Sequence, residues 1–231
     1  MKDIKQSTNS TNKLQSTPCK AIIIGASGMV GTQVLDLLLS SDAYTEVVSL
    51  VRRKSDITHP KLSEHVIDFD QPDTWQHLVN GDVLFSCLGT TIAKAKSTQN
   101  QFKVDFTYQY QVAEIAAQHA VAVYALISSA GANSKSKTFY MQTKGKLDEA
   151  VMKLGFRTLI ILRPGQLYGE RTEKRLGESL GLAVMFTLNK LGLLKKYRPI
   201  HARQVAQALI NAVARKKTKV YTLDKLFKLI K

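Results

Sequence analysis

Cysteine, acidic residues and long apolar runs are all scarce in this chain of 231 residues. Its two cysteines, Cys19 and Cys87, are far apart and show no metal-ligand or CxxC spacing, which argues against a disulfide framework. No apolar run approaches the roughly 18 residues of a membrane-spanning helix. The N-terminal residues also lack the apolar core of a secretory signal. We therefore expect a cytoplasmic protein with reduced thiols and no transmembrane segment.

The scarcity of acidic residues leaves a large positive charge. The chain has 33 Lys and Arg residues against 18 Asp and Glu residues, a formal net charge of +15. The basic residues are dispersed, and no zinc finger, basic helix or RNA-binding aromatic signature accompanies them, which argues against sequence-specific nucleic-acid binding. The charge instead favours anionic small molecules or surfaces as partners. The histidines show no ligand spacing with carboxylates or cysteines, so no metal site is predicted.

Apolar runs of strand length alternate with longer helical patterns over most of the chain. The predicted strands are 20–24, 46–51, 65–69, 83–86, 121–128 and 158–163, and the predicted helices between them are 30–39, 75–79, 102–118 and 140–154. Near-continuous apolar strands separated by amphipathic helices are typical of a parallel sheet covered on both faces. The fold class predicted is α/β, a Rossmann-type doubly wound parallel sheet with helices on both faces.

The two ends of the chain differ from this central pattern. Residues 1–18 are rich in Ser, Thr, Asn, Gln and Lys and are expected to form a flexible arm. Residues 19–231 are expected to form one domain, with a small C-terminal helical cap within 165–231. An apolar helix, 179–194, is interpreted as a lid, with a membrane contact or a homodimer contact as alternatives. His201, which precedes a second helix at 202–215, is interpreted as a surface or capping residue.

The strongest local signal is a glycine-rich turn, GASGMVG, between the first strand and the first helix. Gly25 permits a tight turn, Gly28 allows a pyrophosphate to approach the backbone, and Gly31 allows the helix to pack closely on the strand. The helix N-terminus then offers N–H groups to the phosphates. An ordinary strand-to-helix turn is the alternative. The predicted pyrophosphate-binding residues are Gly25, Ser27, Gly28, Met29, Val30 and Gly31.

Residues after the next strands indicate which dinucleotide would bind. An NAD site usually carries Asp or Glu after the second strand, but this chain has Arg52 and Arg53 there, which suit a 2′-phosphate. NADP(H) is therefore the predicted cofactor, and an exposed basic turn is the alternative. Asp68, at the end of the third strand, is a candidate acceptor for the adenine amino group. The segment after the fourth strand is predicted to lie along the cofactor; its residues are Cys87, Leu88, Gly89 and Thr90.

A Tyr–Lys pair supplies a candidate for proton transfer. Tyr140 and Lys144 are four residues apart on a predicted helix and so lie on one face. A free phenol has a pKa of about 10, and a neighbouring ammonium lowers that value by favouring the phenolate. Lys144 lies on the buried stripe of its helix, so it needs a partner. Ser128 or Ser129, at the end of the fifth strand, could bind the same substrate oxygen.

These motifs, taken in order, resemble those of a known group of enzymes. The segments GASGMVG, CLGTT, SSAGAN, YMQTK and RPGQLYGER, with the arginine pair, are similar to those of atypical short-chain dehydrogenase/reductases. The most similar branch contains the Tat-interacting protein family and its bacterial relatives. The resemblance implies an NADP(H)-binding Rossmann domain in which Tyr140 transfers the proton and Lys144 also binds the nicotinamide ribose. It further implies that Leu167 and Arg175 close over the nicotinamide half.

The function predicted from the sequence is that of an NADP(H)-dependent oxidoreductase. Hydride would pass to or from a small carbonyl or alcohol substrate, with Tyr140 as the proton donor or acceptor. Two alternatives remain open. One is an NADP(H)-sensing regulatory or interaction protein with little turnover. The other is a nucleotide-sugar epimerase, for which the residues after the last predicted strand leave little room. A second Tyr–Lys spacing, Tyr221 and Lys225, is interpreted as packing.

Overall fold

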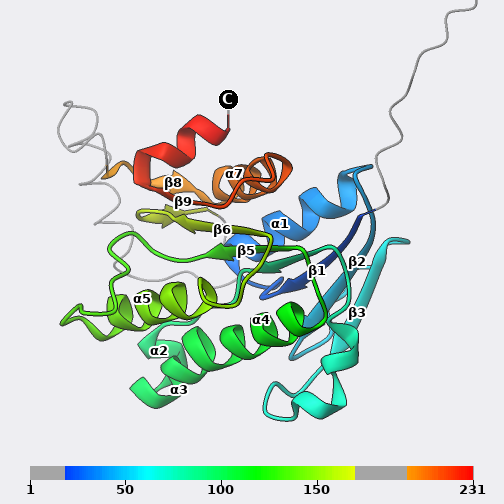
Figure 1. The fold of residues 1–231 in the computed structure, drawn as a ribbon, viewed down its shortest axis with the longest axis horizontal. Helices are drawn as coiled ribbons and strands as arrows, with labels where there is room; N and C mark the ends of the chain where they lie inside the picture. Colours follow the sequence, from blue (N-terminus) through cyan, green and yellow to red (C-terminus); the bar gives the residue numbers. More distant parts are fainter. Residues whose placement is uncertain (1–18, 170–196, 231) are drawn as a thin grey trace, which may run out of the picture.

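The computed structural model describes residues 19–169 and 197–230, and these residues form a layered α/β fold (Figure 1). The central sheet has seven parallel strands in the order β3-β2-β1-β4-β5-β6-β9. The strands are β1 (Cys19–Ile24), β2 (Tyr44–Val51), β3 (Leu62–Val66), β4 (Val83–Ser86), β5 (Val123–Ile127), β6 (Thr158–Arg163) and β9 (Lys219–Thr222). The strand order reverses between β1 and β4, and ligands of open α/β sheets bind at the carboxyl ends of the strands next to such a reversal.

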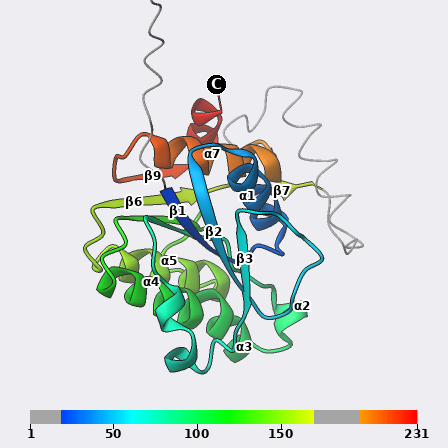
Figure 2. The ribbon, with the colours of Figure 1, turned by 90° about the vertical axis from the view of Figure 1, so that its right-hand side faces the viewer.

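Helices cover both faces of the sheet, as predicted. On one face lie α1 (Met29–Ser40) and α7 (Ala202–Ala214), and on the other lie α4 (Tyr108–Gln118) and α5 (Phe139–Val151) (Figure 1). Side chains of each strand alternate between the two layers. Ile23 of β1 packs in the α1–α7 layer and Ile22 in the α4–α5 layer, and both are fully buried. Figure 2 shows the sheet between the same two layers. The Rossmann-type fold class is therefore confirmed.

The region after β3 differs from the prediction. The third strand begins at Leu62 and ends at Val66, earlier than the predicted 65–69, and the predicted helix 75–79 is replaced by two short turns, η1 (Pro72–Thr74) and η2 (Gln76–Leu78). Trp75 separates the two turns. Its indole N–H donates to the Asp68 carbonyl at 2.7 Å, and its ring is fully buried against Phe69. Burial of this one large side chain fixes the segment without a regular helix.

The long helix predicted at 102–118 is interrupted. It consists of α3 (Thr98–Phe102), a π-helical turn η3 (Lys103–Thr107) and α4, and a short helix α2 (Ile92–Ala95) precedes it. A π turn inserts an extra residue and disturbs the backbone hydrogen bonds of the helix. Here Gln109 donates from Nε2 to the Asp105 carbonyl at 3.0 Å and accepts from the Ser86 hydroxyl at 2.9 Å. The interruption is therefore tied to β4 by a buried hydrogen-bond chain.

The C-terminal elements belong mostly to the main core. Helix α7 packs beside α1, and β9 adds a seventh strand beside β6, although we expected six strands and a cap. The final turn η5 (Leu223–Leu229) buries Leu226 and Leu229 in the same layer. Outside the sheet, the described residues hold a two-stranded pair, β7 (Leu167–Tyr168) with β8 (Ile200–His201).

Two predicted features lie outside the described residues: the arm 1–18 and the apolar helix 179–194. Within the described ranges, no helix is long and apolar enough to cross a membrane.

Candidate functional site

The glycine turn between β1 and α1 is built so tightly that side chains would not fit. Gly25 has φ +78°, a conformation that favours glycine, and a Cβ there would collide with the backbone of Cys87 and Leu88 at the end of β4. The Gly28 N–H donates to the Gly25 carbonyl at 3.0 Å. A Cβ on Gly31 would collide with that same carbonyl. The backbone geometry therefore requires glycine at positions 25 and 31, whereas the pyrophosphate-binding role of Gly28 stays a prediction.

The N-terminus of α1 is left open by this turn. Gly28 occupies the N-cap position without a side-chain cap, and no acidic residue lies in the first turn. The first N–H groups of a helix have no partner within the helix and attract anions. Ser27 is exposed, Met29 is half-buried and Val30 is buried in the α1–α7 layer. The turn and the uncapped helix start, together the glycine cradle, could hold an anion such as a pyrophosphate, and this role stays a prediction.

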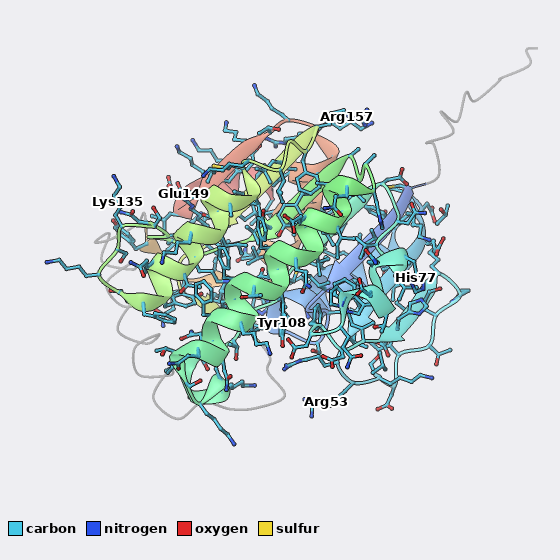
Figure 3. All side chains as sticks on the ribbon, turned by 60° about the horizontal axis from the view of Figure 1, so that its bottom comes forward. Arg53, His77, Tyr108, Lys135, Glu149 and Arg157 are labelled. Atoms are coloured by element: carbon cyan, nitrogen blue, oxygen red, sulfur yellow. The ribbon has the colours of Figure 1, made fainter. Side chains whose placement is uncertain are left out.

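Arg52 and Arg53 lie directly after β2 and are both exposed. Figure 3 shows Arg53 at the opposite end of the molecule from Arg157, which precedes β6 at the amino edge of the sheet. Arg53 is therefore at the carboxyl edge, where the glycine turn also lies. Asp68, beyond β3, is exposed, and its carboxylate accepts from the Asp70 N–H and the Gln71 amide. These contacts leave the assigned roles of the three residues as predictions.

The segment after β4 passes beside the glycine turn. The Cys87 N–H donates to the Ile24 carbonyl at 3.0 Å, which joins the end of β4 to that of β1. Burial raises the pKa of the Cys87 thiol to about 12, which disfavours the nucleophilic thiolate at neutral pH. Leu88 and Thr90 are half-buried, whereas Gly89 is exposed. A Cβ on Gly89 would lie 3.3 Å from Asp105 Oδ1 and 3.8 Å from Lys144 Nζ.

Beneath Gly89 lies a buried ion pair. Lys144 Nζ on α5 is 2.9 Å from Asp105 Oδ1 on η3, and the two side chains are 4% and 0% exposed. The Thr90 N–H approaches the same oxygen at 3.4 Å. Burial by itself would lower the pKa of Lys144, but the groups around it, Asp105 first and then Tyr140 and Asp148, together hold that pKa above its usual value. The partner that Lys144 requires is therefore Asp105.

Asp105 was not among the residues predicted from the sequence. The only signal for it was the burial of Lys144, which calls for an acidic partner without saying where in the chain it lies. The pair joins residues on two different helices, and the π turn sets which side of its helix Asp105 occupies. No local pattern in the sequence indicates either relation.

Tyr140 lies in the first turn of α5 and is half-buried. It precedes Lys144 by four residues on one continuous helix, so both side chains project from the same face. Leu147 and Val151 continue this face and are fully buried against the sheet, as the sequence predicted. The Tyr140 hydroxyl is thus carried on a helix that the core holds firmly.

The two candidate serines differ in their surroundings. Ser128 is buried, whereas Ser129 is half-buried and its hydroxyl donates to the Ala130 carbonyl at 3.4 Å. Ser128 lies near Asp148, a buried residue one turn beyond Lys144 whose carboxylate accepts from Arg163 Nε at 2.7 Å. Burial raises the pKa of Asp148, although the Ser128 hydroxyl and the Arg163 guanidinium act in the opposite direction. Of the two serines, Ser129 therefore has the greater access to a substrate.

The remaining candidates are the loop residues after β6 and the histidines. Leu167 lies in β7 and is half-buried, and Arg175 lies outside the described residues. His201 caps α7: its Nδ1 accepts from the Arg203 N–H at 3.2 Å, and Gln204 completes a capping box. Tyr221 is buried in β9, which confirms that it is a packing residue. Over residues 19–169 and 197–230, no group of three or more His, Cys, Asp or Glu side chains could hold a metal ion.

The fold and the glycine cradle define a nucleotide-binding protein of the Rossmann type. Comparison with known sequences makes this more specific: the chain belongs to the NAD(P)H-binding family, which matches residues 25–216. It is 35% identical over 195 residues to "Protein FMP52, mitochondrial" of Candida albicans, covering 82% of this chain and 85% of that protein. It is 32% identical over 212 residues to the protein of the same name in Eremothecium gossypii, covering 88% and 93%.

Solved structures resemble this fold at low sequence identity. The Bordetella bronchiseptica enzyme WbmH, solved with NAD⁺, superimposes with a TM-score of 0.70 at 15% identity and covers 89% of this chain and 75% of that one. The ADP-L-glycero-D-manno-heptose-6-epimerase of Helicobacter pylori gives a TM-score of 0.67 at 20% identity, covering 89% and 76%. At these identities the likeness concerns the fold alone.

The names of the sequence relatives correct one expectation. We expected a cytoplasmic protein because the sequence carries no secretory signal, but curated relatives with 32% to 36% identity are named as mitochondrial proteins. The cytoplasmic expectation was wrong. The lack of a secretory signal and of a membrane-spanning apolar run says nothing about import into an organelle.

Proposed function

We propose that this protein is an NADP(H)-dependent oxidoreductase of the atypical short-chain dehydrogenase/reductase type, in the branch that contains the Tat-interacting protein family. The observation that carries the proposal is the position of the Lys144 ammonium, held by Asp105 at 2.9 Å directly beneath the exposed Gly89. Tyr140 lies one helical turn away, and the glycine cradle lies at the same edge of the sheet. The proposal thus combines a cation, a phenol and an anion cradle that all belong to the carboxyl edge of the sheet.

The proposed cofactor is a dinucleotide with an additional phosphate. The cradle from Gly25 to Gly31 would hold the pyrophosphate, and Arg52 with Arg53 would hold the 2′-phosphate through planar guanidinium forks. Asp68 would accept from the adenine amino group, and the segment from Cys87 to Thr90, with Leu167 and Arg175, would line the rest of the cofactor. When bound, the cofactor would supply or accept the hydride.

In the reductive direction, Tyr140 would donate its hydroxyl proton to the oxygen of the substrate carbonyl. The oxygen gains negative charge as the carbonyl is reduced, and Ser129 would donate a second hydrogen bond to it. Lys144 would stabilise the Tyr140 phenolate that remains and would bind the nicotinamide ribose. In the oxidative direction the phenolate would remove the hydroxyl proton of an alcohol. The substrate class is a small carbonyl or alcohol compound.

Two other functions remain as alternatives. An epimerase would use the same tyrosine on a sugar hydroxyl, and the neighbours of known structure include a heptose epimerase. The match covers 76% of that enzyme, and at 20% identity the likeness concerns the fold alone. A regulatory protein that senses NADP(H) would use the cradle without turnover.

The names of the relatives also lead us to propose a mitochondrial location, which recovery of the protein from the cytosol alone would overturn.

Turnover separates the oxidoreductase from the sensing protein. The chain is incubated with NADPH and a panel of small aldehydes and ketones, and oxidation of NADPH is followed by absorbance. We expect turnover by the parent and a loss of at least about 100-fold in the Tyr140→Phe variant, because general acid catalysis contributes about 10²–10⁴-fold.

The matched control is Tyr110→Phe, since the Tyr110 hydroxyl donates to Glu114 of its own helix and not to a residue of the candidate site. This control should retain full turnover. Bound NADPH with no oxidation of any compound, or equal turnover by parent and Tyr140→Phe, would reject the proposed reaction.

A further inference from the structure

We propose that Asp105 is a positioning residue that sets the pH at which the Tyr140/Lys144 pair gives up a proton, and that it thereby favours proton donation by Tyr140. The inference rests on the proposed function, because it concerns the groups that would exchange the proton with substrate. It adds Asp105 to the residues of the proposed site and gives the reaction a preferred direction, because a site that keeps Tyr140 protonated serves carbonyl reduction better than alcohol oxidation.

Asp105 and Lys144 form a close, buried ion pair. Asp105 and Lys144 are joined at 2.9 Å with almost no exposure, so water screens neither charge. The Thr90 N–H shares the same Asp105 oxygen at 3.4 Å, and the other carboxylate oxygen, Oδ2, has no hydrogen-bond partner among the described residues. The contacts of the carboxylate thus lie on the side of Lys144 and the β4 loop. Its charge acts mainly on the ammonium.

The stability of the fold does not explain why a charged pair is buried here. A buried ion pair is often no more stable than apolar side chains of similar volume, because both charges lose their hydration. Asp105 also lies in a π turn, its backbone carbonyl accepts from Gln109 Nε2, and Gln109 in turn accepts from the Ser86 hydroxyl. A buried charge pair that brings no clear stability, directly beneath an exposed glycine at the candidate site, indicates a functional role.

Three titratable groups surround the Lys144 ammonium. Asp105 faces it from η3, and Tyr140 and Asp148 face it from the turns of α5 before and after it. The charge of Asp148 is already balanced by Arg163 of β6 at 2.7 Å. Beyond Asp148 lies Tyr124 of β5, which is neutral because burial raises the pKa of its phenol. The net effect is that Asp105 is the main counter-charge of the ammonium next to Tyr140.

The consequence for Tyr140 follows from the sign of these charges. An unbalanced ammonium would strongly favour the phenolate, whereas an ammonium balanced by a carboxylate favours it less. Asp105 therefore keeps the phenol protonated up to a higher pH than Lys144 alone would allow. If Asp105 loses its charge, the Tyr140/Lys144 pair gives up its first proton at a lower pH.

The test is a titration of Tyr140 by the ultraviolet absorption of its phenolate. The chain has 8 tyrosines, so the signal of Tyr140 is taken as the difference between each protein and the same protein carrying Tyr140→Phe. We expect the phenolate of Tyr140 to appear at a pH lower by about one unit in Asp105→Asn than in the parent. An unchanged titration in Asp105→Asn would overturn the proposal.

A second variant decides the matter if Asp105→Asn does not fold. The double variant Asp105→Asn/Lys144→Met removes both buried charges together and leaves no unpaired ion. If Asp105 balances Lys144 in the parent, the double variant should titrate at the pH of the parent. If Asp105 has no influence on Tyr140, the double variant shows only the loss of the ammonium, and its phenolate appears at higher pH.

The same proteins separate this inference from the proposed reaction. A shifted titration in Asp105→Asn with no turnover of any carbonyl would support the role of Asp105 in the titration and reject the oxidoreductase. Turnover by the parent with an unchanged titration would reject the role of Asp105 alone. Where both hold, the upper pH limit of carbonyl reduction should move down in Asp105→Asn together with the phenolate signal, which a purely structural role for Asp105 would not produce.

Discussion

At the scale of single residues, the cradle depends on places where no Cβ fits. Gly25 and Gly31 meet each other across the turn, and Gly25 also meets the backbone at the end of β4. These contacts bring the first turn of α1 close to the carboxyl ends of β1 and β4. The glycine turn therefore offers backbone atoms to a ligand, whereas Tyr140 and Lys144 offer side chains from a helix in the opposite layer.

Substitution of Gly31 tests this dependence. A Cβ in Gly31→Ala would collide with the Gly25 carbonyl, so the turn must open. We expect the free energy of unfolding to fall by about 1–3 kcal/mol, measured by urea denaturation, because overpacking costs that much. NADP(H) binding should weaken as well, since the cradle loses its shape.

The matched control is Gly165→Ala, where the nearest atom to a Cβ, on the Leu223 side chain, is 3.4 Å away, an ordinary contact. Its stability should stay within about 0.5 kcal/mol of the parent. Equal stability of Gly31→Ala and Gly165→Ala would contradict the account of the turn.

The sequence predicts a site residue when the structural constraint on that residue comes from its neighbours in the chain. The glycines were predictable because turn geometry restricts residue type within a few positions. The pairing of Tyr140 with Lys144 was predictable because helical periodicity places them on one face. Asp105 was not, because its contact with Lys144 depends on how two helices pack and on a π turn that no sequence pattern specifies.

At the scale of elements, α7 shows how a polar residue defines the start of a helix. His201 accepts from the Arg203 N–H at 3.2 Å through Nδ1, and Gln204 accepts from the His201 N–H at 3.2 Å. These contacts satisfy N–H groups that the helix itself leaves unpaired. The helix then buries Val205 and Leu209 beside α1. The capping role of His201 agrees with the sequence interpretation.

Replacement of this cap tests its contribution to stability. We expect His201→Ala to lower the free energy of unfolding by about 1 kcal/mol, because an N-cap side chain contributes roughly that amount. His201→Asn retains an acceptor and should restore most of the loss. His77→Ala, an exposed position in η2 on the α4–α5 side of the sheet, opposite α7, is the control and should leave stability unchanged. A loss of the same size in His77→Ala would show that the cap is not the cause.

The elements that the sequence predicted correctly are long or strongly apolar, and those it missed are short. Strands β1, β4 and β6 were predicted within one residue, since they read as continuous apolar runs. Strand β9 was missed because it has four residues, pairs on one side only and begins with Lys219, as is common at the edge of a sheet. The turns around Trp75 were predicted as a helix because one buried aromatic residue resembles part of an apolar stripe.

At the scale of the whole molecule, strand order brings the parts of the site together. The reversal between β1 and β4 places the glycine turn, Arg52 and Arg53 on one side, and the β4 and β5 loops on the other. The helices α1 and α5 belong to opposite layers but both begin at this edge (Figure 1). The net charge of +15 adds a general attraction for anionic ligands. Topology and charge therefore both favour a phosphorylated ligand.

The central claim is that this edge binds a dinucleotide carrying a 2′-phosphate, and calorimetric titration with NADPH and NADH tests it most directly. We expect the parent to bind NADPH more tightly than NADH. Arg52→Ala/Arg53→Ala should weaken NADPH by about tenfold or more, since hydrogen bonds to charged groups contribute about 1.5–3 kcal/mol, and should leave NADH unaffected. Arg157→Ala, at the opposite end of the molecule (Figure 3), should change neither affinity. The absence of NADPH binding, or equal loss of both nucleotides in the arginine variant, would contradict the account.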